Sequence, residues 1–219
     1  LDKDYINAWS SGIDESMMVI VPDVKGGITG QIAGDRDLMN KIRINFDKSG
    51  STVLAETEIE DNFRNNQSFS IDYQVNIPKD RELAIVNRYG NVVVGGLDAK
   101  GSFDVDYGSF TAGNVKTPSG SPMLLQVSYG KATIESVNDA KIDIKYSKLF
   151  ADKIGNLQIV TKYSGIEIDQ CGTIKMDSKY DALSFDQVAS LQSISRYTNY
   201  KIGTLTENLD LDSGYGTVK

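Results

Sequence analysis

The sequence contains no histidine, one cysteine, one tryptophan and only four prolines in 219 residues. Without histidine the chain lacks Ser-His and Cys-His nucleophile pairs, the usual general base at neutral pH and the ligands of most zinc sites. Cys171 has no partner for an intramolecular disulfide or a thiolate metal cluster. Because it occupies an otherwise apolar column of the repeat described below, we expect it to pack as a small buried hydrophobe.

Long apolar runs are absent as well. No stretch reaches the ~20 residues of a membrane-spanning helix, so we predict no transmembrane span. The net charge of −7 argues against nucleic acid as a partner, and we assign no catalytic residue, cofactor or metal. The chain starts at Leu1 rather than at methionine. We interpret it as a processed or truncated product, which fits the removal of an export signal.

A tyrosine returns at nearly constant intervals from about Arg81 to Lys219. The intervals are 17 or 18 residues, except for one of 22. The repeating residues are Tyr89, Tyr107, Tyr129, Tyr146, Tyr163, Tyr180, Tyr197 and Tyr215. A fixed period of this size is typical of stacked supersecondary units, each too small to bury its own apolar face.

Apolar residues alternate with polar ones on both sides of each tyrosine. Four residues before the tyrosine, for example, the column reads Ile85, Phe103, Leu125, Ile142, Ile159, Met176 and Leu211. This period of two, broken once at the tyrosine, indicates strand, turn, strand, turn in each unit. We therefore predict an all-β fold in which residues 81–219 form a parallel β-helix of about eight ~17-residue coils. We expect a right-handed winding.

The residue after each tyrosine marks the first corner of the coil. It is glycine, serine, aspartate or threonine, and glycine in particular tolerates the positive φ of a tight turn, so we expect positive φ there. Two neighbouring architectures do not fit. A left-handed hexapeptide helix needs inward positions every six residues, and leucine-rich repeats need a longer unit with an asparagine ladder.

Residues 1–80 lack the tyrosine period and are predicted to form an N-terminal β cap with the first irregular strands. Residues 41–46 and 52–59 alternate around the turn DKSGS, which indicates a hairpin. Residues 68–77 alternate too, whereas the glycine-bearing segment 23–34 is expected to be a loop. A cap would cover the unpaired strand edge of the first coil. A separate ligand-binding domain is the alternative.

Residues 75–115, VNIPKDRELAIVNRYGNVVVGGLDAKGSFDVDYGSFTAGNV, resemble a bacterial family of adhesin-like β-helices related to the auto-transporter adhesin head domains with a GIN motif. The resemblance extends through the repeat to the C-terminus, and the tyrosine column departs from it. It implies an exported protein of a Bacteroides-like bacterium, located in the periplasm or at the outer cell surface of a Gram-negative cell. It implies adhesion as the function and carries no catalytic motif.

A cationic column directly precedes the tyrosines and is our candidate binding site. It consists of Lys145, Lys162, Lys179 and Arg196, with Arg88 further up the repeat. Asp143 and Asp177 share its outward face and can pair with it. A solvated, self-neutralising face is the plain interpretation, and a site for an anionic glycan is the functional one.

The tyrosines themselves fall in phase with the inward residues, and small residues such as Thr161 and Ser178 stand two positions before them. We therefore expect a stacked aromatic ladder that lies across these small residues and stabilises the fold. The alternative is a row of half-exposed rings that stack against sugars.

Enzymatic function is the main competing class. Parallel β-helices can carry polysaccharide lyases and hydrolases, which need converging carboxylates or cations. Asp104 and Asp106 share one coil, and Glu56, Glu58 and Glu60 share one strand face, but no acidic cluster recurs there. The interval of 22 adds a protruding loop, residues 116–123, and inserted loops on repeat scaffolds often bind ligands.

The leading expectation is a non-catalytic exported protein that binds a cell-surface glycan or another envelope component. A purely structural, self-associating envelope protein is a further alternative. Residues 209–219 stop part-way through a coil without an amphipathic capping segment. We expect a homodimer, or another partner, to cover that open edge.

Overall fold

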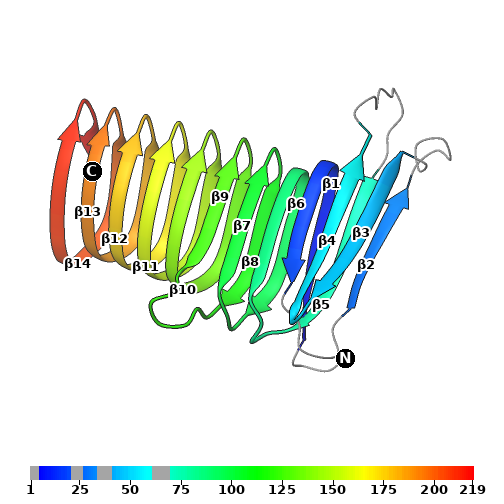
Figure 1. Cartoon of the computed structure of the whole chain (residues 1–219). Coiled ribbons are helices and arrows are strands. Elements are labelled where there is room, and N and C mark those ends of the chain that lie inside the picture. Colours follow the sequence, from blue (N-terminus) through cyan, green and yellow to red (C-terminus); the bar gives the residue numbers. More distant parts are fainter. Residues whose placement is uncertain (1–4, 21–26, 34–40, 61–69) are drawn as a thin grey trace.

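The computed structural model of the chain describes residues 5–20, 27–33, 41–60 and 70–219. Within these ranges every regular element is a β-strand, as the sequence predicts (Figure 1). The strands belong to one continuous sheet whose order runs from β15 and β14 at one end to β4 and β3 at the other.

Residues 83–218 form a β-solenoid of about eight stacked coils, which confirms the predicted fold. Consecutive coils pair in parallel, and β10, β11, β12 and β13, each of 15 residues, supply all of a coil except its sharp corner. The expected right-handed winding stays a prediction. The strands are β6 (Leu83–Leu97), β7 (Gly101–Asp106), β8 (Ser109–Val115), β9 (Met123–Ser128), β10 (Lys131–Lys145), β11 (Lys148–Lys162), β12 (Gly165–Lys179), β13 (Ala182–Arg196), β14 (Asn199–Gly214) and β15 (Thr217–Val218).

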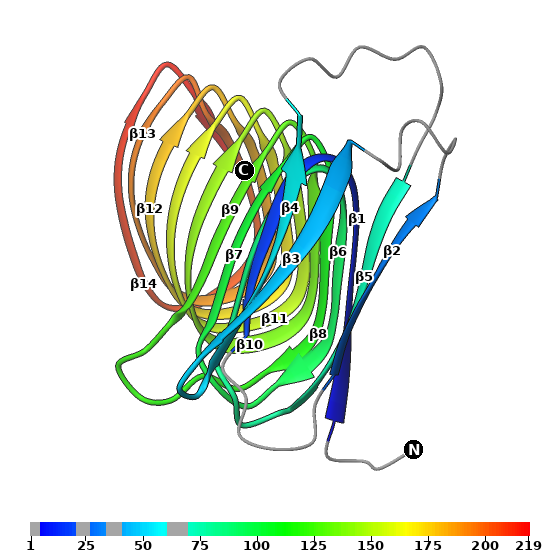
Figure 2. The same ribbon diagram turned by 45° about the vertical axis from the view of Figure 1, so that its right-hand side comes forward.

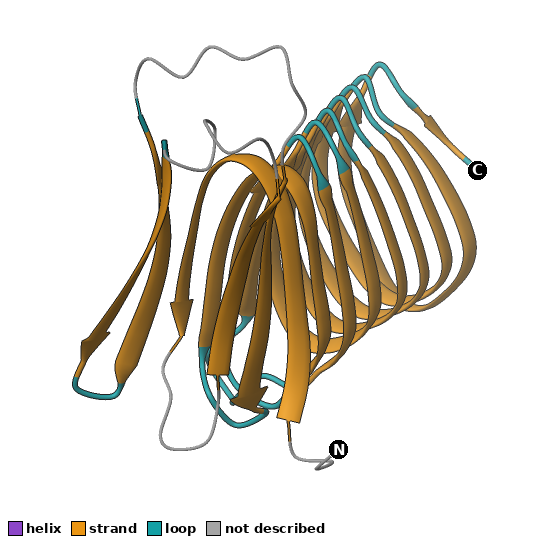
Figure 3. Cartoon of the chain, turned by 90° about the vertical axis from the view of Figure 1, so that its right-hand side faces the viewer, coloured by secondary structure: helices purple, strands orange, loops and turns teal. Residues whose placement is uncertain are grey.

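Each long strand bends in its middle, so that a coil consists of two flat halves joined by a rounded bend at one edge and a sharp corner at the other. The sharp corners form a row of loops along one edge of the solenoid (Figure 3). We call the half before each tyrosine the pre-tyrosine face; its central part comprises residues 140–145, 157–162, 174–179 and 191–196. The half after each tyrosine is the post-tyrosine face, residues 131–137, 148–154, 165–171 and 182–188.

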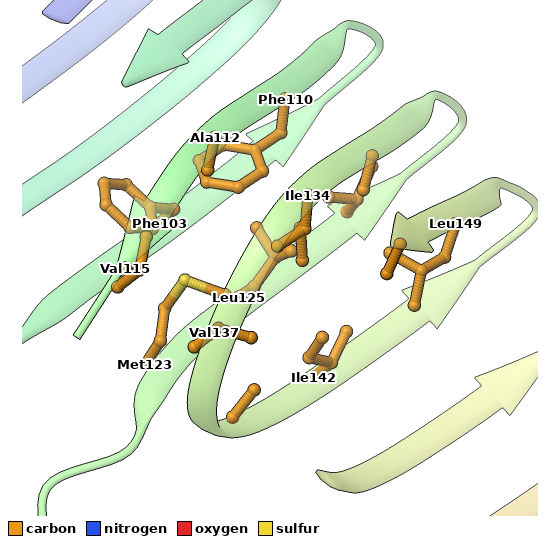
Figure 4. Packing of buried hydrophobic residues seen from close by; sticks show 14 of the residues in the cluster. Phe103, Phe110, Ala112, Val115, Met123, Leu125, Ile134, Val137, Ile142 and Leu149 are labelled. Atoms are coloured by element: carbon orange, nitrogen blue, oxygen red, sulfur yellow. The ribbon is translucent and has the colours of Figure 1, made fainter. Parts of the chain in front are cut away.

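The core fills the space between the two faces. Side chains from both faces interdigitate there, as Phe103, Phe110, Leu125 and Ile142 illustrate (Figure 4). All four are at most 2% exposed, and the predicted apolar columns are buried through most of the repeat. Cys171 is buried in this core, as predicted. Burial raises the pKa of its thiol to about 12, which keeps it protonated and unreactive.

The sharp corner differs from the sequence-based expectation. Positive φ falls on the tyrosine itself, with values of 50–62° at all eight positions, and not on the residue that follows. A left-handed residue at this point reverses the chain, so the alternation of inward and outward side chains is interrupted at the tyrosine. The rings therefore lie at the outer rim, and the prediction that the tyrosines are in phase with the inward residues is wrong.

Glycine after the tyrosine is needed for close approach between coils. A Cβ added to Gly108 would lie 1.6 Å from the backbone oxygen of Gly90, and one added to Gly130 would lie 1.9 Å from that of Gly108. These distances leave no room for a side chain in the first coils. In later coils Ser147, Ser164 and their equivalents occupy the position as buried polar residues.

The N-terminal strands lie on the edge of the first coil. β1 (Tyr5–Ile20) runs antiparallel along β6 from Ala8 opposite Val94 to Ile20 opposite Leu83, so it covers that edge. On its other side β1 pairs with β5 (Ser70–Pro78) and β4 (Thr52–Ile59). The division of the chain into a cap at 1–80 and a repeat at 81–219 stays a prediction.

The predicted hairpin is confirmed. β3 (Ile42–Ser49) pairs antiparallel with β4, and Gly50 in the turn has a φ of 61°. The predicted loop at 23–34 is wrong over β2 (Gly27–Ala33), which pairs antiparallel with β5. Pairing with a neighbouring strand overrides the turn preference of its glycines. The remaining residues of that segment, 23–26 and 34, lie outside the described residues.

The tyrosine corner generates a stability prediction. Replacing Tyr163 by alanine removes its stacking with Tyr146 and Tyr180 but leaves the left-handed backbone. Replacing it by glycine removes the stacking and also relieves the backbone strain of the positive φ. The loss of two stacked ring pairs should lower the free energy of unfolding by about 1–3 kcal/mol in either variant. The alanine variant should be the less stable one by about a further 1 kcal/mol, since alanine is strained at positive φ.

Urea unfolding followed by circular dichroism measures both values. Tyr163→Phe, which keeps the ring, is the control and should unfold like the parent. An alanine variant as stable as the glycine variant would contradict a left-handed conformation at Tyr163.

Candidate functional site

The four predicted site residues form a continuous column on the solenoid surface. Lys145 lies opposite Lys162, Lys162 opposite Lys179 and Lys179 opposite Arg196 in the parallel register. Neighbouring coils are about 4.8 Å apart. The three lysines are exposed and Arg196 is half-buried. The expected column therefore exists, and its role in binding stays a prediction.

Countercharges neutralise only the ends of this column. Lys145 Nζ lies 2.9 Å from Asp143, as predicted, and Arg196 Nη1 lies 3.1 Å from Asp212. Lys162 makes a cation–π contact with the ring of Tyr163 at 5.5 Å. In the described part of the chain neither Lys162 nor Lys179 has an ion pair. The expected pairing of Lys179 with Asp177 is therefore not formed, and the middle of the column carries uncompensated positive charge.

A shallow groove of about 570 Å³ lies on the pre-tyrosine face beside the column. It crosses β9, β10, β11 and β12, and its outward side chains mix cations, carboxylates, amides and apolar groups. Those side chains are Leu124, Gln126, Lys141, Asp143, Gln158, Val160, Lys175 and Asp177. Polar groups that fix orientation together with apolar contact area are typical of ligand sites.

The inserted loop extends this groove. Residues 116–122 connect β8 to β9 and project from the bend edge of the solenoid, which confirms the predicted loop (Figure 2). Gly120 and Pro122 line a second hollow together with Gln158 and Lys175, and both of the latter also line the groove. The loop therefore forms one wall at the end of a continuous depression.

Asn138 holds the loop in place. Its Oδ1 accepts from the Thr117 backbone N–H at 2.6 Å and its Nδ2 donates to the Thr117 carbonyl at 2.9 Å. Thr117 is only 7% exposed, so this two-way contact satisfies backbone groups that would otherwise be buried without partners. The loop base is thus a defined part of the surface.

The tyrosines form the expected aromatic ladder along the sharp corner. Successive ring centroids are 4.8–5.0 Å apart and the ring planes differ by 0–15°. The rings from Tyr89 to Tyr197 are 41–51% exposed, and Tyr215 is 82% exposed. Each internal ring has a neighbouring ring on both faces. Ligands can therefore reach mainly ring edges and hydroxyl groups, which disfavours sugar stacking on the ring faces.

A buried polar network lies behind the ladder. Both carboxylate oxygens of Asp181 accept hydrogen bonds, from the Ser164 backbone N–H at 2.7 Å and from the Lys179 backbone N–H at 2.8 Å. The hydroxyls of Thr161 and Ser178 donate to the same carboxylate at 2.6 and 2.7 Å. Four donors satisfy this carboxylate, which is only 4% exposed. Thr161 and Ser178, two of the small residues before the tyrosines, therefore belong to this network, whereas the equivalent Ser195 Oγ is buried without a hydrogen-bond partner.

The carboxylates considered for catalysis do not form a cluster. Asp106 pairs with Arg88, and Glu58 in β4 and Glu60 directly after it are both exposed. Among the described residues no group of three or more His, Cys, Asp or Glu side chains could hold a metal ion. The enzymatic alternative stays a prediction.

Charge differs between the two faces of the solenoid. Over the four coils that end at Arg196, the outward positions of the pre-tyrosine face carry six cations: Lys141, Lys145, Lys162, Lys175, Lys179 and Arg196. Only Asp143 and Asp177 oppose them on that face. On the post-tyrosine face, next to the rounded bend, equivalent positions of four coils hold an acidic column, Glu135, Asp152, Asp169 and Asp186. The basic face thus stands out on a chain with a net charge of −7.

Sequence reasoning missed the groove and the acidic column. The aligned coils could have indicated the groove, because the outward residues that line it are those five and three positions before each tyrosine. The coils were aligned on their apolar columns, whereas the outward positions vary between charged and neutral residues from coil to coil. Only their register on neighbouring coils makes them one surface.

Comparison of the chain with protein-family models, curated proteins and solved structures found no match. The resemblance to adhesin-like β-helices therefore stays a prediction, as do export and location. In the described part of the chain no helix is long and apolar enough to cross a membrane.

The buried carboxylate generates the next prediction. Asp181→Asn should destabilise the fold by about 1–3 kcal/mol, because an amide NH₂ would face N–H and O–H donors. Asp181→Ser should cost less, since Ser147 and Ser164 occupy the equivalent position in the preceding coils and accept a backbone N–H there. Thermal and urea unfolding compare the two variants. Equal stability of Asp181→Asn and the parent chain would refute the network.

Asp104 generates a pH prediction. Burial raises the pKa of its carboxyl above the ordinary value of 3.8, and the Asp106 charge raises it further against the opposing effects of Arg88 and Lys145. Its contribution to stability is present at low pH and is lost as the pH rises through the folded-state pKa. Asp104→Asn should therefore gain stability relative to the parent between pH 3.8 and neutrality. Urea unfolding across this range tests it; a difference that does not change with pH would contradict the assignment.

Proposed function

We propose that this chain is a non-catalytic, exported recognition scaffold that binds an extended anionic glycan of a cell surface or envelope along its pre-tyrosine face. The observation that carries the proposal is the unpaired middle of the cationic column, Lys162 and Lys179, directly beside the groove. Holding like charges on neighbouring coils costs energy. An anionic ligand would remove that cost on binding.

The shape of the surface favours a long ligand over a small one. The groove is shallow and crosses several coils, and the cationic column runs along the stack in the same direction. A rigid solenoid presents such an extended surface without ordering itself on binding. A linear polymer lying along the coils would contact the column and the groove together.

Self-association is a separate proposal based on the C-terminal coil. β14 pairs with β13 along its length, and among the described residues its other edge contacts only residues 217–219, through β15 at Asn199 and Tyr200 and through a hydrogen bond from the Ile202 N–H to the Lys219 carbonyl. Leu209 and Val218 are 42% and 49% exposed there. A second copy could extend the sheet across this edge.

Binding of the purified chain to an array of bacterial and host glycans tests the main proposal. We expect saturable binding to acidic glycans that weakens at high salt. The double variant Lys162→Glu/Lys179→Glu should lose at least about tenfold in affinity, the equivalent of 1.4 kcal/mol.

The matched control is Lys153→Glu/Lys201→Glu, which makes the same change in net charge on the post-tyrosine side. It should bind like the parent chain. Absence of binding to any acidic glycan, or equal losses in the two variants, would contradict the proposed site.

A further inference from the structure

The outward residue pairs of the groove alternate between charged and neutral with a period of two coils. Lys141 and Asp143 occupy the outward positions of one coil, and Lys175 and Asp177 occupy the same positions two coils later. We call these pairs the charged rungs. Equivalent residues are thus separated by two coil spacings, about 9.6 Å.

Neutral pairs occupy the coils between and after the charged rungs. Gln158 and Val160 lie between them in register and line the groove, and Gln192 and Ile194 follow on the next coil, beyond the residues that line it. Val160 is 48% exposed and Ile194 is 57% exposed, so these apolar side chains face solvent. We call these pairs the neutral rungs. Each combines one amide with one exposed β-branched residue.

Packing and charge repulsion do not account for this alternation. The inward residues on the same strands show no two-coil period; Ile142, Ile159, Met176 and Ser193 form one such column. The cationic column next to the rungs carries a positive charge on each of the four successive coils from Lys145 to Arg196. Avoidance of like charges would act on that column as strongly as on the rungs.

We infer that the groove is matched to a linear anionic polysaccharide whose chemical repeat is a disaccharide with one acidic group. This inference rests on the proposed function and specifies its ligand. Two sugar units of an extended chain bridge about the same distance as two coils. Acidic groups would meet the lysines of the charged rungs, while amides and apolar side chains of the neutral rungs contact the uncharged sugar.

An extended peptide fits this surface less well. Its side chains on one face recur every ~6.8 Å, which is out of step with the ~9.6 Å period of the rungs. A polysaccharide with an acid on every sugar places charge opposite Val160 and Ile194. Desolvating a charge against an apolar side chain is unfavourable, so the neutral rungs select against such a polymer.

A register swap tests the inference. The variant Gln158→Lys/Val160→Asp/Lys175→Gln/Asp177→Val keeps the composition, the net charge and the cationic column, but places charged rungs on adjacent coils. The probes are size-matched fragments of hyaluronan, which has one carboxylate per disaccharide, of polygalacturonate, which has one per sugar, and of neutral dextran. Titration at physiological salt measures each affinity, and circular dichroism verifies that the variant is folded.

We expect the affinity of the parent chain to be at least about tenfold higher for hyaluronan fragments than for polygalacturonate fragments, and we expect no binding of dextran. The swapped variant should lose most of that preference while it still binds acidic polymers. Equal binding of both acidic polymers by the parent chain, or a preference unchanged by the swap, would overturn the inference and leave the proposed function intact. Binding of neither acidic polymer by the parent chain, together with no acidic glycan on the array, would overturn both.

Discussion

Parallel register between coils is the constraint on which this structure depends. Each coil hydrogen-bonds to the next residue by residue, and the pairing continues through the sharp corner, where the Tyr146 N–H donates to the Lys162 carbonyl at 3.0 Å and the Lys148 N–H to the Gly130 carbonyl at 3.1 Å. Because equivalent residues are held at one spacing, any residue type repeated in the sequence becomes a column in space. The core, the aromatic ladder and the charged columns are all consequences of this register.

The tyrosine corner shows how the register supports an unfavourable local conformation. An L-residue at positive φ costs energy in isolation, yet the same conformation occurs at eight successive corners. Stacking of each ring on its neighbours offsets part of that cost, and the offset is available only when neighbouring coils adopt the same corner. The ladder and the corner are therefore cooperative, which favours uniform coils. The buried hydrogen bonds of Asp181 connect the corners at Tyr163 and Tyr180 from the inside.

The surface charge, in contrast to the core and the corners, differs from coil to coil. The pre-tyrosine face is basic, the post-tyrosine face carries an acidic column next to the rounded bend, and the rungs of the groove alternate between charged and neutral pairs. Outward positions do not affect packing, so their pattern is free to follow other requirements. For that reason we base the proposed ligand on these positions and not on the aromatic ladder, whose ring faces are covered by one another.

The sequence alone determined the repeat, the all-β class, the number of coils and the buried columns, because period-two alternation and a fixed repeat length depend only on backbone geometry. It also placed Lys145, Lys162, Lys179 and Arg196 in one column. Only the tertiary structure decided which residue takes positive φ at the corner, where the rings point, and that β2 is a strand. Those features depend on contacts with neighbouring coils or strands, which the local sequence does not encode. The groove likewise exists only because side chains 17 residues apart in the sequence lie side by side on adjacent coils.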